Sequence, residues 1–305
     1  MTESYSRCSA IAESRRMVRS YHRTWSASIT GAIALACLLT AALPLTAHAA
    51  FPMGVPDRVR LSAGGLFAGL TTSAQLSLQG GGAGTTIDGE RDLGLPQHQQ
   101  VLRLEGNVRL LGPLSVDLGW QRFHRSANRV LPSPVTFGEL TFTAGSQVAS
   151  RLDTDFPYAA MRMDLVHTPL VRVGPSLGVS YVTLDAAMSG NAGVLVAGSN
   201  VSGSGERTYK QSAPVPLIGI EGEVSPWPRT AFGGWGRWFD LTFEQFSGSM
   251  SQWGLHADYF MLSNIGVGIG YEQTRVDFRR LVIDPVDATL DYTVSGMRLS
   301  ADFAF

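Results

Sequence analysis

Two residues near the C-terminal end have the types and spacing to polarise water. His256 and Asp258 are separated by one residue, so on a β-strand their side chains project from the same face. A carboxylate beside an imidazole can assist general acid–base hydrolysis. The structural alternative is a buried histidine satisfied by its neighbouring carboxylate, and we favour that interpretation.

A second pair has the types of a nucleophile and its base. His124 and Ser126 are also one residue apart, and both lie an even number of residues from Trp120. On a strand, their side chains would therefore face outward on the same side as Trp120. A serine hydroxyl becomes nucleophilic when a base lies within hydrogen-bond reach and a third group orients that base. The spacing of acidic residues in the sequence does not identify a carboxylate that would orient His124. The alternative is a polar cluster at the end of a strand, near lipid headgroups.

Two loop segments resemble ligand-binding patterns only in part. Asp88, Glu90 and Asp92 alternate as in a calcium loop, but the bidentate acid and the glycine spacing of that loop are missing. The glycine-rich segment 80–84 lacks the following Lys-Ser/Thr of a phosphate-binding loop. We therefore expect solvated loops, with no metal and no cofactor.

Residues 1–49 have the order of a cleavable secretory signal peptide. Basic residues (Arg15, Arg16, Arg19 and Arg23) precede an apolar stretch over 29–47, and Ala47-His48-Ala49 forms a cleavage pattern. Met17 is an alternative start to Met1. Both cysteines, Cys8 and Cys37, lie in this leader. The mature domain, 50–305, is therefore expected to lack disulfides and thiolate sites.

The composition of the mature domain excludes one class of partner. It holds 19 basic against 23 acidic residues, a net charge of about −4. The sequence contains no basic patch, so we expect no nucleic-acid partner. Its roughly 256 residues are enough for one all-β barrel or sandwich.

Apolar and polar residues alternate with period two along most of this domain, as in β-strands. Clusters of Gly, Pro, Ser or Asn separate the alternating segments. They predict ten strands: 58–75, 98–111, 114–127, 151–167, 171–187, 208–224, 236–249, 252–262, 265–279 and 288–305. The segment 128–150 also alternates in part and could add strand, whereas 225–238 is expected to be a long aromatic turn.

Three observations favour a membrane barrel over a soluble sandwich. Short connections alternate with long ones, as in outer-membrane barrels, and the signal peptide directs export. Aromatic residues stand near the ends of the apolar faces, namely Trp120, Tyr181, Trp253, Tyr271, Phe303 and Phe305. We therefore predict a closed antiparallel up-and-down transmembrane β-barrel of about ten strands, with eight or twelve as alternatives. An even number places both termini in the periplasm of a bacterial outer membrane.

The polar faces of the strands would line the lumen of this barrel. The predicted lumen charge network comprises Arg103, Glu105, Arg109, Asp117, Arg162, Asp164, Arg172, Glu221, Asp240, Glu244, His256, Asp258, Glu272, Arg298 and Asp302. Buried charges are costly unless paired, so a network of ion pairs is the first expectation. A narrow, weakly cation-selective water path is the alternative. By alternation, apolar side chains also fall at positions that would face the lumen, namely Leu290, Tyr292 and Val294. This predicts either a bulge in the strand or an upper lumen filled by aromatic side chains.

The ending resembles the C-terminal insertion signal of bacterial outer-membrane β-barrel proteins. Met297, Leu299, Ala301, Phe303 and Phe305 alternate up to a final aromatic residue. The resemblance implies that the barrel assembly machinery reads Phe303 and Phe305. The stretch 87–96, IDGERDLGLP, is similar to an Asp-Leu-Gly-Leu motif of small, mostly uncharacterised proteobacterial barrels.

Two resemblances concern enzymes. His124 and Ser126 resemble part of the His-x-Ser-Asn element of outer-membrane lipid A deacylases, although Ala127 stands where that element has Asn. His256 and Asp258 resemble half of the site of outer-membrane aspartyl-type proteases, without a match for the second acidic pair.

We expect a monomeric barrel with a structural, small-solute-binding or narrow-channel role, surrounded by outer-membrane lipid and lipopolysaccharide. A lipid-modifying or proteolytic hydrolase is the alternative, and the balance of the sequence favours a non-enzyme.

Overall fold

The computed structural model describes residues 58–78, 85–137, 140–196, 199–243, 246–283 and 286–305. The expected signal peptide, the glycine-rich segment 80–84 and Glu244 lie outside these ranges. Every regular element within them is a β-strand. No helix in the described ranges is long and apolar enough to cross a membrane.

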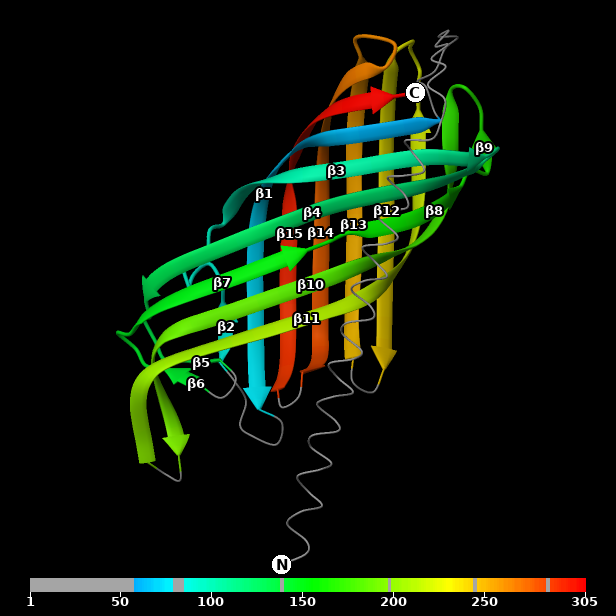
Figure 1. The fold of residues 1–305 in the computed structure, drawn as a ribbon. Helices are drawn as coiled ribbons and strands as arrows, with labels where there is room; N and C mark the ends of the chain where they lie inside the picture. Colours follow the sequence, from blue (N-terminus) through cyan, green and yellow to red (C-terminus); the bar gives the residue numbers. More distant parts are fainter. Residues whose placement is uncertain (1–57, 79–84, 138–139, 197–198, 244–245, 284–285) are drawn as a thin grey trace, which may run out of the picture. The chain divides into compact units, whose positions relative to one another are not determined.

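The strands close into a ring of ten, which confirms the predicted antiparallel barrel and its strand number (Figure 1). The wall consists of β1 (Val59–Leu78), β3 (His98–Leu111), β4 (Leu114–Val130), β7 (Gln147–Asp155) continued by β8 (Tyr158–Met163) and β9 (Val166–His167), β10 (Val171–Val196), β11 (Ser199–Val224), β12 (Thr230–Phe243), β13 (Phe246–Phe260), β14 (Ile265–Ile283) and β15 (Val286–Ala304). The short strands β2 (Thr86–Asp88), β5 (Val135–Phe137) and β6 (Leu140–Phe142) lie outside this ring order.

The ring closes where the last strand pairs with the first. β15 and β1 pair without a register shift from Arg60↔Ala304 to Leu78↔Val286. Beyond β15, the backbone N–H of Phe305 donates to the carbonyl oxygen of Val59 over 2.8 Å. The strands approach closely at Gly64, where a Cβ atom would lie 2.0 Å from the carbonyl oxygen of Leu299.

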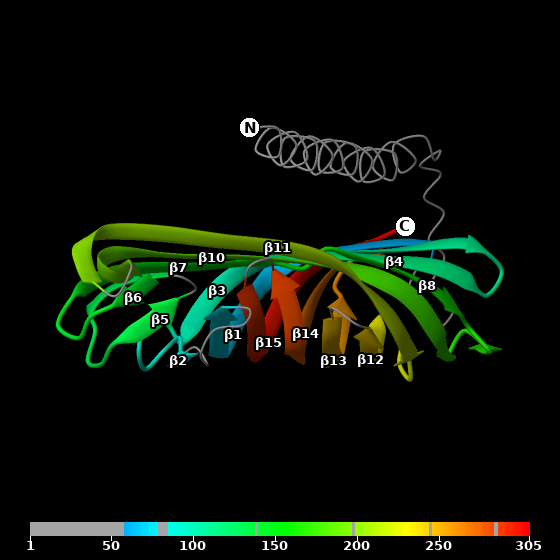
Figure 2. The same cartoon turned by 90° about the horizontal axis from the view of Figure 1, so that it is seen from below.

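The two ends of the barrel differ in their connections. At the turn end, next to the C-terminus, the strands are joined by 112–113, 168–170, 225–229 and 261–264. At the loop end, β2, β5 and β6 lie together, as Figures 1 and 2 both show. β2 pairs with β1, and β6 pairs with β5 and β10. The extra strand considered for 128–150 is therefore present as β5 and β6.

The connection before β12 is shorter than predicted. Strand β12 begins at Thr230 and β13 at Phe246, so the long turn expected over 225–238 is wrong. Most of that segment is barrel wall in register with β11 and β13. Gly233, Gly234 and Gly236 leave gaps in the side-chain pattern of both faces, and this conceals the alternation.

Alternation divides each strand between the outside and the lumen. In β15, Met297, Leu299, Ala301 and Phe303 are exposed on the outer surface, whereas Arg298 is buried inside. The same pattern exposes apolar side chains on the turn-end half of the other wall strands. Trp253 lies at the boundary of this apolar band that is nearer the loop end. Its indole N–H donates a hydrogen bond to Gln273 Oε1 over 2.9 Å.

Candidate functional site

An apolar layer crosses the middle of the lumen. Its buried residues come from all ten wall strands and from the loop after β2: Leu66, Ala68, Leu70, Leu95, Val101, Phe123, Leu152, Phe156, Val182, Val215, Leu217, Phe239, Met250, Val276, Phe278, Tyr292 and Val294. They form one packed cluster. Buried polar residues, among them Thr72, Arg125 and Thr154, lie beside members of this cluster.

Three aromatic rings occupy the centre of this layer. Phe156 meets Phe123 edge-on at a centroid distance of 6.3 Å and stacks on Tyr292 at 6.1 Å. The buried Tyr292 hydroxyl lies 3.1 Å from Thr154 Oγ1 and so retains a polar partner. An aromatic-filled lumen is observed around Tyr292. The register is also irregular beside this segment, where β14 shifts between Phe278 and Leu281 opposite Leu290 and Ala288.

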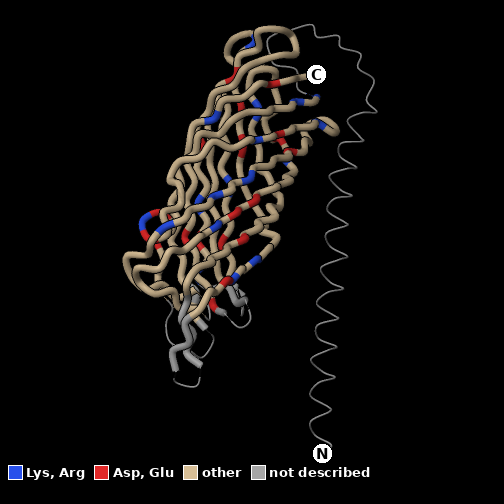
Figure 3. The backbone as a smooth tube through the Cα atoms, turned by 60° about the vertical axis from the view of Figure 1, so that its left-hand side comes forward, with Lys and Arg blue, Asp and Glu red and all other residues tan. Residues whose placement is uncertain are grey.

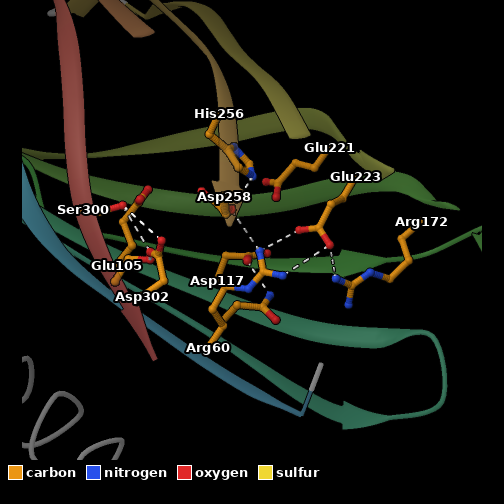
Figure 4. A network of polar contacts seen from close by, with 12 residues as sticks. Arg60, Glu105, Asp117, Arg172, Glu221, Glu223, His256, Asp258, Ser300 and Asp302 are labelled. Atoms are coloured by element: carbon orange, nitrogen blue, oxygen red, sulfur yellow. Dashed lines mark hydrogen bonds and ion pairs between the residues drawn. The ribbon is translucent and has the colours of Figure 1, made fainter. Parts of the chain in front are cut away.

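A polar chamber lies between the apolar layer and the turn end. Figure 4 shows its network of polar contacts. It encloses a cavity of about 100 Å³. Arg60 pairs with Glu223 at 2.7 Å, and Arg172 contacts the same carboxylate from the opposite side. Arg237 pairs with Glu221 at 2.6 Å, and Arg298 pairs with Glu105. The charges therefore form a network of ion pairs, and Figure 3 shows both signs interspersed along the strands.

Most of the predicted lumen charges lie inside the barrel wall. Those with buried or half-buried side chains are Arg103, Glu105, Arg109, Asp117, Arg162, Asp164, Arg172, Glu221, His256, Asp258, Glu272, Arg298 and Asp302. The prediction was wrong for Asp240, which faces outward. Its side chain is 69% exposed and pairs with Arg279. The prediction failed because the start of β12 was misplaced, and the inward neighbour is Phe239. Glu244 is outside the described residues.

The pair His256 and Asp258 belongs to the polar chamber. Nε2 of His256 lies 3.6 Å from Oδ2 of Asp258, and Arg60 approaches the same oxygen at 3.6 Å. The pair is part of the ion-pair network and is separated from the loop end by the apolar layer. No group of three or more His, Asp or Glu residues in the described ranges could hold a metal ion.

The loop over 86–97 folds into the lumen instead of standing in solvent. Glu90 accepts hydrogen bonds from Arg125 Nη1 over 2.6 Å and from the Thr72 backbone N–H over 2.9 Å. The side chains of Arg125 and Glu90 are 0% and 5% exposed. The expectation of a solvated loop is therefore wrong at Glu90. Its carboxylate anchors the loop to the wall and is not free for calcium.

The Asp-Leu-Gly-Leu motif of this loop seals the apolar layer. Leu95 is buried in the layer, and its backbone N–H donates to Gly89 over 2.9 Å. Gly94 has a φ of +75°, a conformation that favours glycine. The motif thus turns the chain so that Leu95 points into the lumen.

A second cavity lies on the loop-end side of the layer. Its volume is about 110 Å³, and its lining is predominantly apolar. Leu93 and Ile87 come from the loop and β2, Phe137 from β5, and Met188 from β10. Phe137 packs edge-on against Tyr209 at 5.2 Å. This apolar cavity is therefore built jointly by the barrel wall and the segments folded over it.

The pair His124 and Ser126 faces outward, as its parity predicts. Both side chains are exposed, and Nδ1 of His124 lies 2.5 Å from Oδ1 of Asp153 on the neighbouring strand β7. Strand register places Ser126 opposite Arg151. The acid that spacing could not assign is therefore present beside the imidazole. It was missed because β4–β7 pairing spans the intervening residues 131–146.

Comparisons with known proteins agree on the fold. No protein-family model matches the chain, and no curated protein matches its sequence. The outer-membrane protease OmpT from Escherichia coli superposes with a TM-score of 0.52 at 12% identity, over 84% of this chain and 100% of OmpT.

Two other similar structures superpose with lower scores. The toluene transporter TbuX from Ralstonia pickettii gives a TM-score of 0.36 at 10% identity, over 82% of this chain and 90% of TbuX. The attachment invasion protein Ail from Yersinia pestis gives 0.27 at 10% identity, over 79% of this chain and 99% of Ail. At these identities the likeness to OmpT shows the fold alone, that of an outer-membrane β-barrel.

Proposed function

We propose that the protein is a closed, monomeric outer-membrane barrel that binds a small solute from outside and does not conduct. Short periplasmic turns are typical of outer-membrane barrels, which supports a periplasmic turn end with both mature termini and an external loop end. Outer-membrane lipid and lipopolysaccharide would surround the apolar band. The barrel assembly machinery would read Phe303 and Phe305 during insertion.

The apolar layer is the observation that supports a closed barrel. Water or an ion crossing it would have to leave its hydrogen-bond partners, and burying such groups without compensation is costly. The layer is packed by side chains from every wall strand and by Leu95. Opening a path would therefore require several core side chains to move together.

Planar-bilayer recording tests the closed state. The wild-type protein should give no steady conductance, whereas the triple variant Phe123→Gly, Phe156→Gly, Tyr292→Gly should conduct because it removes the three central rings. The matched control is Phe67→Gly, which removes an exposed ring from the outer surface and should remain silent. Steady wild-type current would refute the closed barrel.

Hydrolysis of an outer-leaflet lipid ester is the second candidate function. Its support is the contact between His124 and Asp153, which was not assignable from spacing. Asp153 would orient the imidazole, His124 would take the proton of the Ser126 hydroxyl, and Ser126 would attack the ester carbonyl. The ester C–O bond would break as the alcohol leaves with the proton from His124. Water, deprotonated by His124, would then hydrolyse the acyl-Ser126 ester, releasing the fatty acid and restoring the serine hydroxyl.

Mass spectrometry of lipid A tests this candidate. Cells that express the protein should lose an acyl chain from lipid A, and Ser126→Ala or Asp153→Asn should abolish the loss. Ser251→Ala, at another exposed serine on the outer surface, should behave as wild type. Identical lipid A with and without the protein would eliminate the hydrolase.

A further inference from the structure

We infer that the apolar cavity at the loop end binds a free hydrocarbon of about the size of a benzene ring. This inference rests on the proposed closed barrel and names the chemical class of its solute. An engineered apolar cavity of roughly 150 Å³ in another protein stays dry and binds benzene. The cavity here, at about 110 Å³, belongs to the same size class.

The lining disfavours water as the occupant. A buried water usually needs two to four polar partners. Thr72, Ser150, Arg151, Gln211 and Thr289 also belong to the lining, but almost all of the surface facing the cavity is apolar. The main apolar contributors are Ile87, Leu93, Leu95, Leu152, Leu184 and Met188. Phe137 and Tyr209 provide an aromatic edge at one side. The chemistry therefore selects a compact apolar molecule over a hydrated or charged one.

The strand pairing closes one side of the cavity. β7 and β10 pair without a register shift from Thr183↔Asp155 to Gly190↔Val148, and β10 pairs with β11 continuously beside the cavity. These ladders leave no lateral opening in this part of the wall for the tail of a membrane lipid. On this side of the cavity, access is therefore left to the loop end, where a free molecule would arrive.

Methyl NMR with toluene as the probe tests this inference in the full mature barrel, reconstituted in lipid nanodiscs. The Met188 methyl group is buried at the cavity and should shift saturably as toluene is added. Met297 is exposed on the lipid-facing surface and should show only the linear response of toluene dissolved in lipid. Met188→Leu assigns the first signal.

Filling the cavity provides the decisive comparison. Ala186→Leu should weaken the saturable shift at Met188 at least tenfold, and Ala74→Leu, at another lining position, tests the same point if the first variant does not fold. Ala63→Leu places the same group on the exposed outer face of β1 and should leave the shift unchanged. Heat-modifiable gel migration verifies folding of each variant.

The possible outcomes separate this inference from the proposed function. A Met188 response that parallels Met297, or a saturable shift that survives both filling variants, would overturn the hydrocarbon site. Recording conductance from the same preparation shows independently whether the barrel is closed. A lipid tail as the true occupant would appear as a Met188 signal that changes with the acyl-chain length of the nanodisc lipid and does not respond to toluene; this would also overturn the inference.

Discussion

Replacing Arg125 with Met should release the loop over 86–97 from the lumen. Among the described contacts, Arg125 holds the loop through Glu90, over 2.6 Å, whereas its contacts with Thr72 and the Tyr292 ring remain within the barrel wall. Met preserves much of the packing against Tyr292. The substitution therefore isolates the ion pair between loop and wall.

The expected magnitude follows from the burial of this pair. Both side chains are almost completely buried, and removing one partner of a buried ion pair costs about 3–5 kcal/mol. Because the loop can open and return Glu90 to water, we take the lower value for the free energy of opening. About 3 kcal/mol corresponds to an approximately hundredfold larger open population.

Trypsin cleavage after Arg91 measures that population. The Arg91 side chain is 75% exposed but lies in the folded loop, so cleavage should require opening and its rate should track the open population. Arg125→Met should be cut about a hundredfold faster than wild type. The double variant Glu90→Gln, Arg125→Met leaves no unpaired charge and should return to within about tenfold, after correction for cleavage of the matching unfolded peptides.

A matched control is available on the same strand. Arg122 is exposed on the outer surface, so Arg122→Met should change the rate by less than about twofold. A change below threefold in Arg125→Met would refute the anchoring role of the ion pair. A double variant cut as fast as the single one would show that the effect does not come from an unpaired Glu90.

Two further predictions concern the closing strand pair and the pH response of the loop. Gly64→Ala should prevent heat-modifiable barrel formation because its Cβ would lie 2.0 Å from the Leu299 carbonyl oxygen; Gly65→Ala, whose nearest contact would be 3.9 Å away, should assemble normally. The hydrogen bond from Arg91 lowers the pKa of Asp92. The ionised Asp92 carboxylate therefore stabilises the folded loop above the ordinary carboxyl pKa of about 3.9, and this stabilisation is lost as the pH falls through the lowered pKa of the folded state. Pepsin cleavage of the loop, normalised to an unfolded substrate, should therefore accelerate below pH 4 in the wild type, and a flat profile would contradict this.

The wall of the barrel was predictable because its cause is local. A strand with lipid on one side and the lumen on the other must alternate, and this pattern predicted β15 down to the outward Met297 and the inward Arg298. The prediction failed where glycines replace side chains, around Gly234 and Gly236 in β12. Asp240 was then assigned to the wrong face because the register of its strand was wrong.

The candidate sites were less predictable because their partners meet only across the closed ring. Glu90 has no local sign of burial, since Arg125 is 35 residues away. His124 was recognisable as a candidate base, but Asp153 became its neighbour only through the pairing of β4 with β7. Alternation along a strand predicts which face of the wall a side chain occupies, but it does not predict which residue of a neighbouring strand or loop it will contact.

The apolar layer gives the two ends of the barrel different chemistry. On the turn-end side, Arg60 and Glu223 belong to a chamber whose charges largely satisfy one another. On the loop-end side, Leu95 closes the layer while its neighbour Leu93 lines an apolar cavity. One short motif thus contributes side chains to both the apolar layer and the cavity. Loss of the Glu90 anchor should therefore weaken hydrocarbon binding before it disrupts the barrel, because the wall strands retain their pairing when the loop opens.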